Sequence, residues 1–411
     1  MKKLLGLLVV LAVALPASAD VLKNVEIKGE IQTIASDVNH NEVDGDPITP
    51  ADIYNAGTGY RVLAGLSANL VEDVTANLTF QQADMWNGAI AGDSYLNHEG
   101  NTALAEANVV LSNLFDCFEA TIGRQFYGEE DSAVMYFGPN HYNAEGMYAP
   151  SVDAAKLTYA DDAKALTVIA GKIDLTTGLG LAPNTFAGAD FRMNLTDAIK
   201  LQAYLYDFNN VDDGTGTGTE TRYVGFYGAK LSFAPEAFLL SAEYARNFGG
   251  HKFLKEEGKE NRGYMLKVDG AVNVEAFKVR GAFLYETEDF WAFGNYTPGL
   301  LIGHVFGGQT NLYSAEGVRM FNVGIDVNPF EKWTFSLDGY SFQDRFGHHS
   351  ATFEGDLVAK YQHNEYVQLF AGFGYAKYGT NEPMNAPAGV TYKGYLHKDN
   401  FKGQLGMLIN F

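Results

Sequence analysis

The chain ends, at residues 401–411, with the sequence F-K-G-Q-L-G-M-L-I-N-F. The residues at odd positions, among them Phe401, Leu405 and Phe411, are all apolar or glycine. Lys402 and Gln404 lie at even positions between them. Successive side chains of a β-strand point to opposite faces. The alternation therefore predicts a strand with one apolar and one more polar face, and it places Phe411 on the apolar face.

The same period of two recurs towards the N-terminus. Residues 25–35 read V-E-I-K-G-E-I-Q-T-I-A, in which apolar residues or glycine alternate with charged or polar ones over most of the stretch. Residues 60–70 and 74–81 repeat the pattern, with only 71–73 between them. No linker, low-complexity tract or shift of composition interrupts the series. The sequence therefore predicts one all-β unit built from many similar strands.

Short and long connections alternate between the predicted strands. The short ones lie near 71–73, 112–116, 161–164, 196–198, 234–236, 272–274, 329–332 and 362–365, and the long ones near 37–57, 85–102, 127–151, 176–185, 209–220, 249–261, 288–316, 344–349 and 378–397. They imply eighteen strands of about ten to thirteen residues, the length that a tilted strand needs to cross a bilayer. Sixteen strands remain an alternative, because the segments at 152–160 and 187–195 have weak patterns.

The predicted fold class is thus an all-β, transmembrane, antiparallel up-and-down β-barrel, with short periplasmic turns and long extracellular loops. Composition agrees: charged residues make up 19% of the chain, aromatic residues 13%, and the mean hydropathy is −0.13. A bundle of membrane helices would need several runs of about 20 apolar residues. The net charge of −21 excludes nucleic acid as a partner, because phosphate contacts need clustered Lys and Arg.

The first residues have the pattern of an export signal. Lys2 and Lys3 precede an apolar stretch at 4–15, and Ala17-Ser18-Ala19 is a small-residue cleavage site. The apolar stretch is too short to cross a bilayer as a helix. We predict that residues 1–19 form a cleaved signal peptide and that residues 20–411 form a single outer-membrane barrel domain.

A soluble all-β protein is the main alternative fold, since soluble sandwiches also alternate but turn the apolar face inward. The end of the chain favours the membrane. A strand that alternates up to a terminal Phe411 resembles the signal that outer-membrane barrels present to the barrel assembly machinery. Aromatic residues near strand ends, such as Tyr60, Trp333 and Tyr375, are typical of interfacial girdles. The sequence therefore predicts a bacterial outer-membrane protein in contact with lipid and lipopolysaccharide.

Residues 105–138 resemble a segment of the alginate-export family of outer-membrane barrels. In that family a strand ending in N-L-F and a turn lead to a strand ending in G-R-Q, followed by an acidic loop. Here Asn113-Leu114-Phe115, Gly123-Arg124-Gln125 and Gly128-Glu129-Glu130-Asp131 occupy those places. The resemblance implies an eighteen-stranded barrel and export of a polysaccharide. An exporter of a polyanion needs a strongly basic lumen, and the sequence departs from that expectation.

Alternation also predicts which charged side chains point into the lumen. Basic and acidic residues are about equally frequent there, so that the excess of acid falls in the loops. A wall of mixed charge favours a water-filled pore for neutral or zwitterionic solutes. The predicted pore-lining residues are Lys28, Arg61, Glu106, Glu119, Arg192, Lys267, Lys278, Arg280, Asp338, Glu354 and Asp356.

Signals for other chemistry are weak. Oxygen-bearing residues between Asp37 and Asp46 resemble a set of calcium ligands, although the segment lacks the Gly and Glu of an EF-hand loop. Apart from a calcium ion in this loop, no cofactor is predicted. The single cysteine, Cys117, excludes an intramolecular disulfide framework. No G-x-S-x-G, H-E-x-x-H or P-loop pattern is present, and the adjacent His348 and His349 point apart on a strand. No enzymatic activity, catalytic residue or metal centre is predicted.

Two classes of function remain open. The first is a porin-like channel for passive diffusion of small hydrophilic solutes, constricted by the long connections at 127–151 and 288–316. The second is a structural or surface-interaction barrel with a plugged lumen. Conductance separates the two, because an open pore passes ions and a plugged one does not. The resemblance adds polysaccharide export as a further alternative.

Overall fold

The predicted strands form one continuous sheet in the computed structural model. The structure describes residues 23–38, 57–86, 101–141, 147–173, 184–209, 223–249, 263–287, 290, 292–294, 296, 298–300, 317–344, 351–377 and 400–411. The predicted signal peptide at 1–19, the calcium-like segment beyond Val38 and the pair His348-His349 lie outside these residues. The described ranges contain no helix that is long and apolar enough to cross a membrane.

The wall of the barrel is a sheet of 18 strands. They are β1 (Lys23–Val38), β2 (Gly57–Val71), β3 (Val74–Trp86), β4 (Asn101–Leu114), β5 (Phe118–Gln125), β8 (Val152–Ala160), β9 (Lys164–Ile173), β10 (Asn184–Asn194), β11 (Ile199–Asn209), β12 (Tyr223–Phe233), β13 (Phe238–Phe248), β14 (Tyr264–Val274), β15 (Phe277–Glu286), β16 (Val318–Phe330), β17 (Trp333–Asp344), β18 (Thr352–Gln362), β19 (Val367–Lys377) and β20 (Asn400–Asn410). Two further short strands, β6 (Tyr127–Gly128) and β7 (Tyr136–Phe137), pair with each other.

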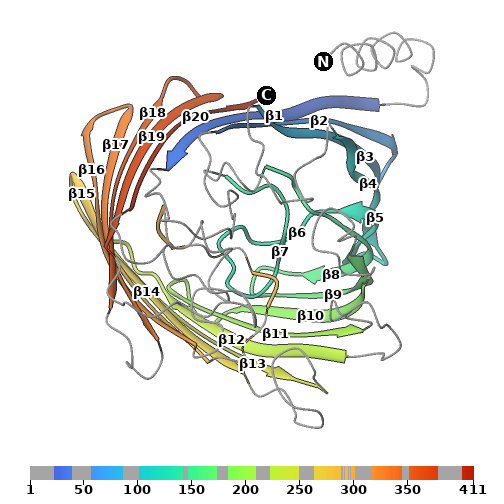
Figure 1. The fold of residues 1–411 in the computed structure, drawn as a ribbon. Coiled ribbons are helices and arrows are strands. Elements are labelled where there is room, and N and C mark those ends of the chain that lie inside the picture. The colour runs from blue at the N-terminus through green and yellow to red at the C-terminus, as the bar shows by residue number, and fades with distance from the viewer. Residues whose placement is uncertain are drawn as a thin grey trace, which may run out of the picture.

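The sheet closes on itself, because β1 pairs with β2 on one side and with β20 on the other. Each wall strand is antiparallel to the next one along the chain, which is up-and-down topology. Figure 1 shows the resulting ring, with the first and last strands side by side. The predicted fold class and the count of eighteen strands are therefore confirmed. The two segments with weak sequence patterns are regular strands, β8 and β10.

Short connections join strands at one end of the barrel, called here the short-turn side, and the longer ones lie at the opposite, long-loop side. One predicted turn is wrong. The strands β14 and β15 meet at Glu275-Ala276 rather than at 272–274, because Val272 and Val274 still pair with β15. Glu275 has a φ of +44°, a left-handed conformation that closes the tight turn.

The two faces of the wall differ in the way that a membrane barrel requires. Outward-facing apolar side chains are exposed, for example Val323 at 68% and Leu405 at 64%. Inward-facing polar and charged side chains are buried, among them Arg61 and Lys267. A soluble sandwich would bury its apolar face, so the soluble alternative is wrong.

Two connections from the long-loop side fold into the barrel. The first, the long inner loop, comprises the described residues 126–141 and 147–151 between β5 and β8, and it contains β6 and β7. The second, the short inner loop, comprises the described residues between 287 and 300, after β15. Figure 1 shows β6 and β7 inside the ring of strands.

Candidate functional site

The inner wall is apolar where the two inner loops pack against it. Ile169, Phe208 and Phe226 face inward from β9, β11 and β12, and all three are fully buried. They form one cluster with Val134 and with further side chains from both inner loops. Burial of apolar area is the main stabilising term in protein folding. The cluster therefore holds the inner loops against this part of the wall.

The two inner loops also contact each other inside the barrel. Met135 and Phe293 form a parallel β-bridge, in which the Tyr136 N–H donates to the Phe293 carbonyl at 2.9 Å. The Phe293 ring lies 4.8 Å from that of Phe208 and 5.5 Å from that of Phe137. The loops are thus tied to each other as well as to the wall.

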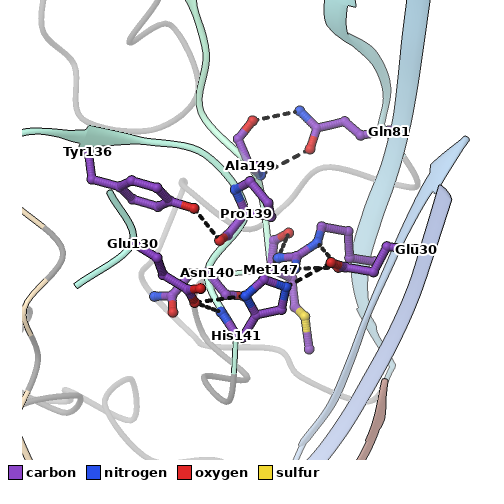
Figure 2. Close-up of polar contacts among 10 residues, drawn as sticks. Glu30, Gln81, Glu130, Tyr136, Pro139, Asn140, His141, Met147 and Ala149 are labelled. Atoms are coloured by element: carbon purple, nitrogen blue, oxygen red, sulfur yellow. Dashed lines mark hydrogen bonds and ion pairs between the residues drawn. The ribbon is translucent and has the colours of Figure 1, made fainter. Parts of the chain in front are cut away.

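On the opposite side of the long inner loop, β1, β2 and β3 hold it by polar contacts (Figure 2). Arg61 is fully buried and donates to Glu30 through both Nε, at 3.0 Å, and Nη2, at 2.5 Å. Its Nη1 donates to the loop carbonyls of Asn140, at 2.9 Å, and Met147, at 3.2 Å. A planar guanidinium suits such multiple acceptors. Arg61 therefore joins two wall strands to the loop.

Gln81 and His141 add two further contacts between wall and loop (Figure 2). The Gln81 amide both donates to and accepts from the backbone of Ala149, at 3.1 and 3.0 Å. His141 lies between two carboxylates: its Nε2 is 2.7 Å from Glu30 and its Nδ1 is 2.8 Å from Glu130. We call Glu30, Arg61, Glu130 and His141 the anchor cluster.

The anchor cluster shifts the pKa values of its loop members. Burial by itself lowers the pKa of His141, but hydrogen bonds to Glu130 and Glu30 and the charges of both carboxylates outweigh it and raise that pKa to about 9. Burial by itself raises the pKa of Glu130, but the hydrogen bonds and charge of His141 outweigh it and hold that pKa below its ordinary value. His141 is thus an imidazolium at neutral pH.

The short inner loop crosses to β18. The Leu300 N–H donates to the Asp356 carboxylate at 2.8 Å, and Gly299 lies directly against Glu354, where a Cβ would come within 2.6 Å of the carboxylate. Gly299 has a φ of +83°, which favours glycine. At the near end, the Lys267 ammonium lies 3.8 Å from the centroid of the Tyr296 ring, a cation–π contact. The loop therefore spans part of the lumen from β14 and β15 to β18.

An ion-pair network lies on the inner wall between β15 and β17. Arg280 donates from Nη2 to Asp326 on β16 at 2.8 Å and to Asp338 on β17 at 2.9 Å. Asn322 donates to the same Asp338 at 3.2 Å. The charge of Arg280 is therefore engaged by wall carboxylates.

A polar chamber of about 450 Å³ lies between the long inner loop and the wall strands β5 and β8 to β13. Arg192 bridges Asp190 on its own strand, at 2.9 Å, and Glu129 on the loop, at 2.6 Å. Lys156 and Glu119 also line the chamber, and neither makes a hydrogen bond or ion pair within the described part of the chain. The chamber thus offers water both an acidic and a basic group.

The predicted pore-lining residues all occupy the inward phase of their strands. Arg61, Lys267, Asp338, Glu354 and Asp356 are buried there by the inner loops and by neighbouring wall residues. Arg192 and Glu119 line the chamber, and Glu106 accepts a hydrogen bond from Thr79 at 2.8 Å. Lys28, Lys278 and Arg280 complete the set. Whether any of them lines a conducting path stays a prediction.

Four residues of the site are not identified as site residues from the sequence: Gln81, Glu129, Glu130 and His141. The acidic run at 128–131 is visible in the sequence, but nothing marks it as a segment that turns into the lumen. Gly128, at its start, has a φ of +94° and lies against the Met135 carbonyl, so a Cβ would clash there. His141 is a lone histidine in a long connection, and no sequence pattern distinguishes it.

The described residues contain no group of three or more His, Cys, Asp and Glu side chains that could hold a metal ion. The calcium-like segment begins at Asp37, near the end of β1, and the rest of it lies outside the described residues. A loop calcium therefore stays a prediction.

Comparisons with known proteins establish the fold. No protein-family profile matches the sequence, and no curated protein is similar to it in sequence. The crystal structure of Acinetobacter baumannii OccAB1 matches with a TM-score of 0.62 at 10% identity, over 95% of this chain and 97% of that one. Pseudomonas aeruginosa OccK11 (OpdR) matches with 0.60 at 10% identity, over 95% and 96%. The outer membrane protein OpdK of the same organism matches with 0.58 at 10% identity, over 94% and 99%.

These matches cover almost the whole of each chain, so the closed 18-stranded barrel is the fold of this group of outer-membrane proteins. At 10% identity the likeness is one of fold. The resemblance to the alginate-export family is not supported, because the matching structures are Occ-type proteins and no family profile matches. The motif at 105–138 contains most of β4, all of β5 and the first part of the long inner loop.

Proposed function

We propose that the protein is a porin-like channel of a bacterial outer membrane, through which small hydrophilic solutes diffuse passively. One observation carries the proposal. Two inner loops cross a closed barrel whose inner wall is polar outside the apolar cluster, and they leave a chamber of about 450 Å³ lined by both acidic and basic side chains. A narrowed lumen of mixed charge admits small polar solutes and favours neither sign strongly.

The outer surface supports the location. Exposed apolar side chains cover the outward face of the strands, which suits acyl chains of lipid and of lipopolysaccharide. The fold is shared with outer-membrane proteins. Insertion by the barrel assembly machinery, with Phe411 as its signal, is part of the proposal. The proposal assigns no chemical reaction to the chain, and nucleic acid has no part in it.

The test is conductance of the purified, folded barrel in a planar lipid bilayer. We expect discrete steps of current, and permeation of small zwitterionic solutes into vesicles that hold the protein. A protein without conductance steps would be a plugged barrel, which is the structural alternative. Passage of long polysaccharide chains would favour the alternative function of polysaccharide export. An inner wall of mixed charge, however, lacks the continuous basic surface that would bind a polyanion.

Lys278 provides a prediction about ion selectivity. It lies on the inward face of β15 near the short-turn side and makes no hydrogen bond or ion pair within the described residues. We expect Lys278→Glu to move the reversal potential in a salt gradient towards cations. The shift should be largest at low salt and should fade at about 1 M salt. The electrostatic screening length is about 8 Å at physiological ionic strength and only about 3 Å at about 1 M.

Lys164→Glu is the matched control for this prediction. It makes the same change of charge on the short-turn side, but Lys164 lies outside the lumen and pairs with Asp161. Its reversal potential should equal that of the wild type. A folded Lys278→Glu variant that behaves like Lys164→Glu at low salt would show that Lys278 does not face the conducting path. Arg280 is left unchanged, because it pairs with both Asp326 and Asp338, and its replacement would remove these ion pairs as well as a charge.

A further inference from the structure

We infer that His141 is the positioning residue of the long inner loop, and that loss of its proton releases the loop from β1 and β2. The inference rests on the proposed function for its effect on conduction, but the docking of the loop can be tested separately. It starts from the geometry of the anchor cluster, in which one imidazole ring joins a loop carboxylate to a wall carboxylate (Figure 2).

The two contacts of the ring require a protonated histidine. An ionised carboxylate accepts hydrogen bonds and donates none, whereas a neutral imidazole carries a single N–H. Both ring nitrogens lie within 2.8 Å of a carboxylate oxygen, of Glu130 on one side and of Glu30 on the other. Only an imidazolium donates to both. A neutral ring would turn a lone pair towards one carboxylate at hydrogen-bond distance.

The balance of charge around the ring leads to the same requirement. Glu30 on β1 and Glu130 on the loop are acidic, and Arg61 on β2 is the other basic member of the anchor cluster. Tyr136 of the loop and Lys360 on β18 also interact electrostatically with Glu130. The anchor cluster is neutral only when His141 carries a proton. Within these four residues, deprotonation would leave two partly buried carboxylates and one guanidinium.

The direction of the pH dependence follows from the raised pKa of His141. A released histidine titrates near 6.5 and the docked one near 9, so the ring favours docking fully below about pH 6.5. That contribution declines between these values and is lost above about pH 9. The lowered pKa of Glu130 sets the acid limit, because docking weakens again as pH falls through its docked pKa. The full alkaline change corresponds to a factor on the order of 10² in the docking equilibrium.

Release of the loop can be measured without any conduction. Met147 is 4% exposed, packs with Ile34 and Phe370 of the wall, and its carbonyl accepts from Arg61. Met147→Cys places a smaller side chain there, so it does not overpack the site. The exposed native Cys117, in the turn before β5, provides an internal reference. The ratio of the labelling rates of the two thiols removes most of the pH dependence of the thiolate itself.

We expect this ratio to rise at least tenfold between about pH 6 and about pH 9.5. In the His141→Lys variant, which keeps a positive charge over that range, the ratio should stay low at both pH values. In His141→Gln, which has no charge, it should be high at both. His363→Gln is the matched control, because His363 lies in the turn between β18 and β19, and it should behave like the wild type.

Channel recordings give the functional counterpart. Transitions between conductance levels should become more frequent above about pH 9 in the wild type and in His363→Gln, at all pH values in His141→Gln, and at none in His141→Lys. A labelling ratio that is the same at both pH values in the wild-type background would overturn the inference, as would a His141→Lys variant that keeps the wild-type pH profile. A barrel that shows the labelling changes but never conducts would refute the proposed function and leave the inference standing.

Discussion

Arg61→Met should release the long inner loop at neutral pH. The guanidinium is fully buried and donates hydrogen bonds to the Glu30 carboxylate and to the carbonyls of Asn140 and Met147. Removing one partner of a buried ion pair costs about 3–5 kcal/mol, because the other charge stays buried without compensation. His141 still contacts Glu30, so we expect the lower end of this range. A cost of about 3 kcal/mol corresponds to about a 10²-fold higher labelling rate of Met147→Cys relative to Cys117 at pH 7.

Arg124→Met is the matched control. Arg124 makes a two-pronged pair with Asp153, at 2.7 and 2.8 Å, but this pair faces outward near the long-loop side and is partly exposed. The unbroken register of β5 with β8 keeps Arg124 on the outward face. Exposed pairs contribute little. Equal labelling rates for the two variants would show that Arg61 does not hold the loop.

Removal of Phe411 should lower the amount of folded barrel in the outer membrane by tenfold or more. The residue closes the seam: its N–H donates to the Gly29 carbonyl at 3.0 Å, and the Gly29 N–H donates to its carbonyl at 2.7 Å. Its ring lies on the outer face over Gly29, where a Cβ would come within 2.6 Å of the ring. If the assembly machinery also recognises this residue, the deletion removes both the signal and the last contact. Heat-modifiable, protease-resistant protein in membrane fractions is the readout.

Phe401→Ala serves as the comparison, since Phe401 is an outward aromatic residue at the other end of the same strand. It should assemble normally. Refolding of both variants from urea into detergent micelles separates the two roles of Phe411, because no machinery is present there. An unchanged yield of assembled barrel after deletion of Phe411 would rule out the C-terminal signal.

The phase of the strands could be predicted from sequence, because polarity alternates strictly where one face meets lipid and the other water. Glu354 and Asp356 alternate with Phe353 and Leu357, and the structure places the two acids inside and the two apolar residues outside. The number of strands followed from the same periodicity. The exact turn at Glu275 did not, because Val272 and Val274 continue the pattern of either strand.

The contents of the lumen could not be predicted in the same way. Phe208 and Phe226 face inward, whereas the outward neighbours of Phe208 are the polar Asp207 and Asn209, so that polarity does not mark the inner face there. The contact of His141 with Glu30 joins residues 111 positions apart. Such contacts depend on how a long connection folds back into the barrel, and a single sequence carries no periodic signal for that. Length alone indicated that the connection at 127–151 was able to constrict the lumen.

The apolar cluster inside the barrel has a thermal consequence. Outward side chains such as Val323 and Leu405 stay in lipid or detergent whether or not the inner loops are docked. The inner cluster of Ile169, Phe208, Phe226 and the loop residues is instead shielded from water by the chain itself. If the loops leave it, apolar surface meets water, and exposure of apolar surface to water raises the heat capacity. Calorimetry of this barrel should therefore show an increase in heat capacity when the inner loops leave the cluster, below the temperature at which the wall strands unfold. The unfolding of a small soluble domain gives the same kind of increase.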